Sequence, residues 1–264
     1  MRTDVLQAIT ICLHGNAYLA DPSADRVSEL LGSNSLFKCV FELAFERQPQ
    51  GGRMMIPLGN SVAPWLRRLK TEDVRQLRLY LAKLAFPGDK VPDGEWGIVT
   101  DGNVGTELWE PLWKSRLVRY DEPSSWKVTY SAHRFLRWTI AEPPTGDFVF
   151  GTLERDWKDL HAHALQLGQV ETADQCDRML HLHLAESSTL PSHQDLLPPT
   201  LADHSLILTS SCVRAIMTVL SPSVAYSLKH RNATEFTLAA RQLWRTALTG
   251  LECISYQERW AKAS

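Results

Sequence analysis

The sequence of 264 residues lacks the short motifs that identify several large classes of enzyme. Its five cysteines lie far apart and form no Cys-x-x-Cys pair, which argues against a zinc ribbon and a thioredoxin-type redox site. The Gly102–Gly105 segment has no Gly-Lys ending, and the chain contains no dinucleotide-binding fingerprint. We therefore expect no bound cofactor, and a catalytic function is the less favoured interpretation.

The chain also lacks a hydrophobic run long enough to cross a membrane, which requires about 20 apolar residues. Its apolar N-terminal stretch, Val5–Leu13, makes a poor signal peptide because Gln7 interrupts it and Asp4 precedes it. Scattered cysteines in a chain of this length are typical of buried thiols in a reducing compartment. We expect a cytoplasmic protein without a membrane partner.

The composition is that of a folded globular protein, with an unusual number of tryptophans. Hydrophobic residues make up 44% and charged residues 22% of the chain, which argues against disorder or a coiled coil. Six of the nine tryptophans fall between Trp65 and Trp138. Because such large side chains dominate cores and interfaces, we expect this cluster to be mainly core.

The net charge of −2 conceals regions of different charge. Residues 141–207 hold 11 acidic and 3 basic side chains, so this stretch is strongly acidic. Residues 61–140 hold 13 basic and 10 acidic side chains, and residues 208–264 hold 7 basic and 3 acidic ones. The basic regions suit contact with phosphate and the acidic region suits a basic partner; alternatively, all are solvated faces of one fold.

Hydrophobic periodicity predicts an α+β protein whose first part, residues 1–140, mixes helices and strands. A helix is predicted at Ser23–Leu31, and short strands at Met54–Leu58 and Trp96–Thr100. An amphipathic helix is predicted over Thr71–Leu84, because apolar residues recur there among arginines and lysines after a capping threonine.

The second part, residues 147–264, is predicted to be mostly helical. The doubled proline in Glu142–Gly146 marks the boundary, since paired prolines stop helices. Two helices, Leu153–Leu167 and Thr172–Leu184, are expected to form a hairpin around Gly168. The remaining expected features are a Pro- and Ser-rich loop at 187–205, a helix at Ser211–Leu220, and a C-terminal helix with the apolar stripe Phe236, Ala240, Leu243, Ala247, Leu251 and Ile254.

The segment from Val104 to Trp138 reads, in order, GTELWEPLWKS, RLVRY, DEPSS, WKVTY and SAHRFLRW. This pattern predicts a helix over Glu107–Ser115, two strands around a wing at Asp121–Ser125, and a closing helix over Ser131–Trp138. The order helix, strand, wing, strand, helix resembles the end of a winged helix-turn-helix module, whose recognition helix enters the DNA groove. The resemblance is one of pattern, spans about residues 71–139 and identifies no specific family.

The winged-helix resemblance implies an interface with nucleic acid, in which phosphate contacts dominate affinity. The expected recognition helix departs from a good DNA reader, because Glu107, Glu110 and Pro111 offer few donors to base edges. It therefore suits packing against protein at least as well. The basic residues able to face phosphate are Lys114, Arg116, Arg119, Lys127 and Arg134.

A second basic row lies on the predicted C-terminal helix. Arg241 and Arg245 are one helical turn apart, and Arg231 lies upstream of the helix. This row suits contact with phosphate or with an acidic neighbour, although a solvated helix face is the more common arrangement.

The predicted helical hairpin is rich in histidine. Asp159 precedes His163 by four residues, and Asp177 precedes His181 by four, so each pair shares one helix face and offers an oxygen and a nitrogen to a metal. Across the hairpin, His163 is expected near Cys176, which makes a His/Cys/Asp site conceivable. We favour the simpler interpretation of Asp–His surface pairs and assign no metal site.

Three functions remain open on the sequence alone. The first is a non-catalytic subunit or adaptor of a multi-protein assembly, with protein partners and possible contact with nucleic acid through basic surfaces. The second is a dedicated protein-binding module, such as an inhibitor or immunity-type protein, that uses the acidic 147–204 face. The third is a metal-dependent enzyme built on the histidine-rich hairpin.

Overall fold

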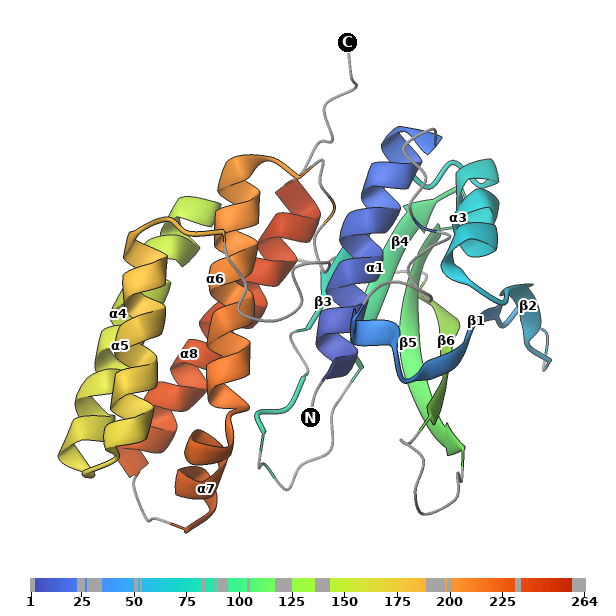
Figure 1. Ribbon diagram of the computed structural model, residues 1–264. Coiled ribbons are helices and arrows are strands. Elements are labelled where there is room, and N and C mark those ends of the chain that lie inside the picture. The colour runs from blue at the N-terminus through green and yellow to red at the C-terminus, as the bar shows by residue number, and fades with distance from the viewer. Residues whose placement is uncertain are drawn as a thin grey trace.

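The computed structural model shows an α+β protein, as the periodicity predicts, with a six-stranded sheet and a bundle of helices (Figure 1). Within the part of the chain that the structure describes, no single helix is long and apolar enough to cross a membrane. The described residues are 3–22, 27, 35–49, 52, 54–81, 84–87, 89, 95–103, 105–116, 125–135, 143–188, 198, 201–230 and 234–257.

The sheet is mixed and lies in the first part of the chain. Its strands follow the order β2-β1-β6-β5-β4-β3, with β1 and β6 parallel and the other neighbours antiparallel. Strands β2 and β4 match the strands predicted from the sequence. The strand bounds are β1 (Val40–Arg47), β2 (Ile56–Gly59), β3 (Leu77–Tyr80), β4 (Gly97–Gly102), β5 (Gly105–Arg116) and β6 (Ser125–Phe135).

The two helices of the expected winged-helix ending are wrong, whereas its return strand, residues 126–130, is confirmed as part of β6. Glu107–Ser115, predicted as the recognition helix, lies within strand β5, and the first residues of the expected closing helix lie in β6. Strand β5 pairs with β6 along its length and with β4 at its start. Alternate side chains therefore face opposite sides of the sheet, and Trp109 is directed to the buried side. Residues 121–124 of the expected wing, and residues 117–120 of the strand expected before it, are outside the described residues.

The helix predicted over Thr71–Leu84 is also wrong. Helix α3 (Val62–Thr71) ends where that helix was expected to begin, and strand β3 follows it. Leu77 and Leu79 are fully or almost fully buried, whereas Arg78 between them is partly exposed. This two-residue period is that of a strand and not of a helix.

The second part of the chain is helical, as predicted. The hairpin is formed by two antiparallel helices whose turn contains Gly168 at φ +66°, a conformation that favours glycine at a helix end. All six residues of the predicted C-terminal stripe are buried. The helix bounds are α4 (Gly146–Gln166), α5 (Val170–Leu184), α6 (Asp203–Val219), α7 (Pro222–His230) and α8 (Thr234–Gln257).

Helix α1 (Thr3–Ala20) lies between the sheet and the helical bundle (Figure 1). Its Asn16 completes the outer edge of β3, since the side-chain oxygen accepts from the Leu77 N–H at 2.6 Å and the amide donates to the Leu77 carbonyl at 3.0 Å. On the same edge, the Leu79 N–H donates to Ser255 Oγ of α8 at 2.9 Å. These contacts cover a sheet edge that would otherwise present unpaired backbone groups.

An aromatic cluster forms the centre of the sheet's buried face. Phe45 of β1 stacks on Trp65 of α3 at 4.2 Å and on Tyr130 of β6 at 5.3 Å between ring centroids. Trp109 of β5 meets Trp65 edge to face at 5.1 Å. All four rings are fully buried, so the tryptophans at positions 65 and 109 are core residues, as the sequence predicts.

Candidate functional site

The predicted winged-helix cations lie on a sheet instead of around a wing. Lys114 of β5 is directly opposite Lys127 of β6, and Lys127 forms an ion pair with Glu42 of β1 at 2.5 Å. Arg116 is the last residue of β5, and the backbone of Arg134 on β6 lies opposite that of Glu107 on β5. Arg119 is outside the described residues. Because Lys127 is already neutralised, this strand pair offers less positive charge than the sequence suggests.

The two arginines of the C-terminal row lie on α8 but have different surroundings. The Arg241 guanidinium binds both carboxylate oxygens of Asp89 at 2.8 and 2.6 Å and lies 4.6 Å from the centroid of the Phe86 ring. The hydrogen bonds and charge of Arg241 lower the pKa of Asp89, with a smaller contribution from Arg245. Arg241 therefore fastens the segment after β3 onto α8, while Arg245 is exposed.

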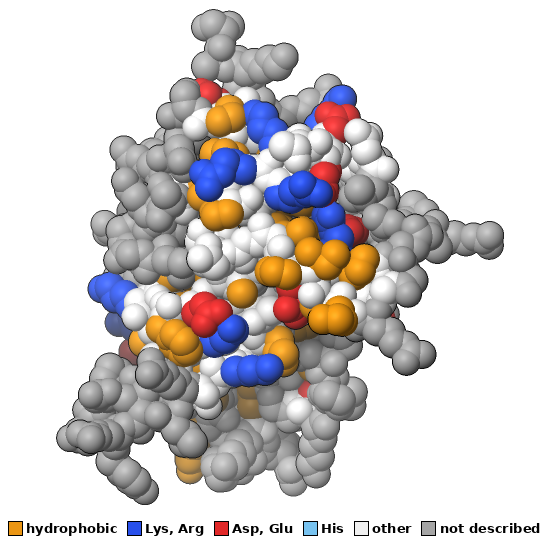
Figure 2. Space-filling model, turned by 90° about the vertical axis from the view of Figure 1, so that its right-hand side faces the viewer, with side chains coloured by type: hydrophobic (Ala, Val, Ile, Leu, Met, Phe, Trp, Pro, Cys, Tyr) orange, Lys and Arg blue, Asp and Glu red, His pale blue; other side chains and the backbone are white. Residues whose placement is uncertain are grey.

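A basic face on α3 is a candidate interface that the sequence reading missed. The helix buries Trp65, Leu66 and Leu69 against the sheet, whereas Arg67 and Lys70 are exposed. Figure 2 shows the side of the molecule where α3, β1 and β2 lie, with lysine and arginine side chains among apolar and acidic ones. The sequence does contain a signal for this face, because cations alternate with apolar residues along the short helix in the pattern of an amphipathic helix.

Exposed apolar side chains accompany these cations. Met54 is 81% exposed next to β2, Ile56 of β2 is 49% exposed and Phe41 of β1 is 47% exposed. Strand β2 lies against α3, so the α3 cations and this edge of the sheet belong to one side of the molecule. A surface that combines cations with apolar groups is typical of an interface with an anionic macromolecule or an acidic protein.

The C-terminal end of α3 is anchored by a buried ion network. Arg47 at the end of β1 binds Glu72 through two hydrogen bonds of 2.9 and 2.7 Å and contacts the buried Glu107 at 2.8 Å. Burial acts to raise the pKa of Glu72, but the hydrogen bonds and charges of Arg47 and Arg68 outweigh it and lower that pKa. This network fixes the orientation in which α3 presents its exposed cations.

The α4–α5 hairpin is the acidic counterpart of the basic face. It lies at the opposite end of the molecule from α3 and β2 (Figure 1). Its exposed apolar residues include Phe148 at 64% and Val170 at 63% exposed. Its exposed carboxylates are those of Asp147, Asp159, Glu171, Asp174, Asp177 and Glu186.

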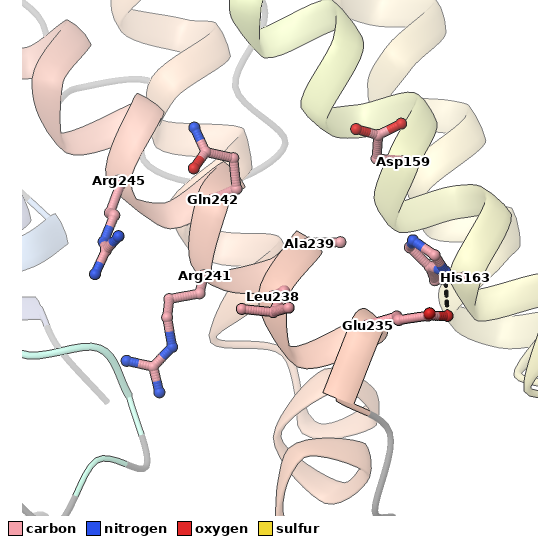
Figure 3. Close-up of a pocket in the computed structure, with 8 residues that line it drawn as sticks. All are labelled: Asp159, His163, Glu235, Leu238, Ala239, Arg241, Gln242 and Arg245. Carbon is pink, nitrogen blue, oxygen red and sulfur yellow. Dashed lines mark ion pairs between the residues drawn. The ribbon is translucent and has the colours of Figure 1, made fainter.

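A pocket of about 350 Å³ opens between α4 and α8 (Figure 3). The Nδ1–H of His163 donates a hydrogen bond to Gln166 Oε1 at 3.1 Å, and His163 lies 4.0 Å from the Glu235 carboxylate. In Figure 3 Asp159, His163 and Glu235 lie on one side, whereas Arg241 and Arg245 extend toward the other. The lining residues are Asp159, His163, Glu235, Leu238, Ala239, Arg241, Gln242 and Arg245.

The hairpin histidines have separate environments. His181 forms the expected surface pair with Asp177 at 3.6 Å, but His163 pairs with Glu235 and not with Asp159. His183 is fully buried: its Nε2 donates to the Phe150 carbonyl and its Nδ1 accepts from a serine hydroxyl, both at 3.1 Å. Among the described residues, no three His, Cys, Asp or Glu side chains are grouped so that they could hold a metal ion.

The cysteines are free, and four of the five are buried as the sequence predicts, whereas Cys39 is exposed. Burial raises the pKa of Cys176 to about 12, so this thiol stays protonated and is a poor metal ligand or nucleophile. Comparison of the chain with protein-family models, with curated proteins and with solved structures finds no match. Function is therefore inferred from the charge and geometry of the described residues.

Proposed function

We propose that this protein is a cytoplasmic, non-catalytic adaptor subunit of a multi-protein assembly, and that its basic α3 face contacts nucleic acid within that assembly. The observation that carries the proposal is the separation of charge along the molecule. Exposed cations lie on α3 at one end, and exposed carboxylates lie on the α4–α5 hairpin at the other (Figure 1). Two surfaces of opposite character suit a protein that joins two different partners.

The α3 face meets the physical requirements of a phosphate-binding surface. Arg67 and Lys70 are exposed on the rigid helix α3. Arginine and lysine side chains that neutralise phosphates release condensed counterions, which supplies affinity without base-specific contacts. The contact is therefore expected to tolerate different sequences and to weaken steeply with salt.

Anisotropy titration of labelled duplex DNA, single-stranded DNA and single-stranded RNA tests this contact. The double variant Arg67→Glu/Lys70→Glu is expected to lower affinity and to reduce the slope of log affinity against log salt by about two, one unit for each lost phosphate contact. Lys158→Glu/Arg178→Glu on the α4–α5 hairpin is the matched control, because it makes the same charge change at two exposed sites. Equal weakening by the control, or no binding at low salt, would contradict the proposal.

A dedicated protein-binding module is the second candidate, and the exposed carboxylates and apolar side chains of the α4–α5 hairpin favour it. A pull-down with and without nuclease separates the two. Protein companions that are lost together with nucleic acid after nuclease treatment support the adaptor, whereas one stoichiometric protein that survives nuclease supports the protein-binding module.

A further inference from the structure

Helix α5 presents an exposed stripe that is apolar at both ends and acidic in the middle. Val170 and Leu184 at the two ends are 63% and 52% exposed, and the exposed Asp174 and Asp177 lie between them. The members of the stripe recur at spacings of four and three residues, so they share one face of the helix. They are Val170, Asp174, Asp177, His181 and Leu184. Apolar side chains at helical spacing that face outward mark a surface suited to packing against another molecule.

Within the described residues, the charge of this stripe is met in part. Asp177 lies 3.6 Å from His181, in a pair that is charged only when the histidine is protonated. Asp174 has no lysine or arginine at ion-pair distance in that part of the chain. Glu171 and Arg178 follow the flank of the stripe, where their charges are opposite, so the middle of the stripe stays negative.

Helix α3 presents two cations at the matching spacing. Arg67 and Lys70 are exposed and three residues apart, the same separation as that of the two aspartates in the α5 stripe. Lys70 reaches the Leu19 carbonyl at 3.4 Å, and neither cation has a carboxylate at ion-pair distance among the described residues. Both pairs span about 4.5 Å along their helix axes, so two ion pairs form together when α5 packs along α3.

The two helices lie at opposite ends of the molecule, so they cannot meet within one chain (Figure 1). A second copy brings its α5 stripe to α3 of the first. The apolar ends of the stripe then meet the exposed Phe41, Met54 and Ile56 of the α3 side. Exposed ion pairs contribute little affinity by themselves, so burial of these apolar groups supplies most of it and the charges set the orientation.

We propose that the α5 stripe of one copy docks on the basic α3 face of a second copy. Because the two surfaces differ and lie at opposite ends, the contact is head-to-tail and repeats into a ring or an open chain. One helix packed on another makes a small interface, so the association is weak and depends on protein concentration. This inference goes beyond the proposed adaptor function: the same α3 cations serve both contacts, so nucleic acid and the second copy compete for one face.

Sedimentation velocity on the nuclease-treated full chain tests the contact. At low salt the average mass of the wild-type chain is expected to rise with protein concentration, and to return to that of one chain at high salt, which screens exposed charges. Arg67→Glu/Lys70→Glu and Asp174→Lys/Asp177→Lys are each expected to stay monomeric. An equimolar mixture of the two variants is expected to associate again, because the acidic α3 face of one meets the basic α5 stripe of the other.

The control Asp159→Lys/Glu235→Lys makes the same charge change at two exposed carboxylates on α4 and α8, and should associate as the wild-type chain does. A monomeric wild-type chain, association that persists in either docking variant alone, a mixture that stays monomeric, or equal loss in the control would overturn the inference. If the wild-type chain stays monomeric but binds nucleic acid in a salt-sensitive manner, the self-association fails and the adaptor function stands. Association without any binding of nucleic acid would give the converse.

Discussion

The sheet and the helical bundle bury very different interiors. The sheet is centred on four aromatic rings in contact, and its buried charges lie at the rim, where Arg47 meets Glu72 and Glu107. The bundle contains polar groups deep inside it, including Asp156, His183 and Arg214. The stability of the first region therefore depends mainly on packing, whereas that of the second depends on hydrogen bonds and protonation.

The polar interior of the bundle forms a connected network. The His183 Nε2 must carry its proton, because its partner, the Phe150 carbonyl, can only accept a hydrogen bond. Its Nδ1 then accepts from the Ser211 hydroxyl, whose oxygen in turn accepts from Arg214 at 2.9 Å. Arg214 also donates to the Ser187 carbonyl at 3.0 Å, which ties the end of the hairpin to α6. Such hydrogen-bonded buried groups specify one arrangement of the helices.

The largest expected effect comes from removing the centre of the aromatic cluster. Trp65→Ala deletes a fully buried ring that contacts two other rings and should lower the free energy of unfolding by about 4 kcal/mol. Urea unfolding followed by circular dichroism measures the change. Phe148→Ala is the control, because this side chain is 64% exposed on α4 and should cost less than about 0.5 kcal/mol. Similar losses for both variants would show that the cluster does not dominate the sheet region.

We expect the stability of the helical bundle to depend on pH and that of the sheet not to. Burial lowers the pKa of His183 to about 4, so between pH 6.5 and 4 the unfolded chain binds a proton that the native chain does not. Stability is therefore complete above about pH 6.5 and is expected to fall, by on the order of 3 kcal/mol, as the pH decreases to 4. Unfolding midpoints measured across this range test the expectation.

The variant His183→Gln removes the titrating ring and should flatten the pH profile in this window, even if it lowers stability at neutral pH. His181→Gln, two residues away, is the matched control because His181 is exposed. A profile that stays steep in the His183 variant would assign the pH dependence to other groups.

The smallest expected effect concerns the join between the two regions. Arg241→Met keeps the stem over Phe86 but removes both hydrogen bonds to Asp89, which are partly exposed, and should cost about 1 kcal/mol. Hydrogen exchange of the amides at Leu84–Phe86 should accelerate while those of β5 and β6 stay protected. Arg245→Met should leave the stability and the exchange rates unchanged. Faster exchange throughout the sheet in Arg241→Met would show that the contact between the two regions supports the whole sheet.

The helices of the second part could be predicted because each is long and its apolar periodicity lies within its own residues. The α8 stripe from Phe236 to Ile254 repeats over several turns, and Gly168 marks the turn between α4 and α5. The candidate sites were less accessible to prediction. Arg241 looked like a phosphate ligand because its partner, Asp89, is 152 residues away in the sequence. The pocket at His163 depends on Glu235, 72 residues later, and not on the expected neighbour Cys176.

The sequence by itself determined the α+β class, the helical second part and the uneven distribution of charge, because these follow from composition and from local periodicity. Only the tertiary structure decided that Glu107–Ser115 is a strand, since its conformation depends on pairing with β4 and β6 and on burial of Trp109. It also decided which charges are neutralised and which remain exposed. Side-chain partners distant in sequence are chosen by packing, which short-range patterns do not encode.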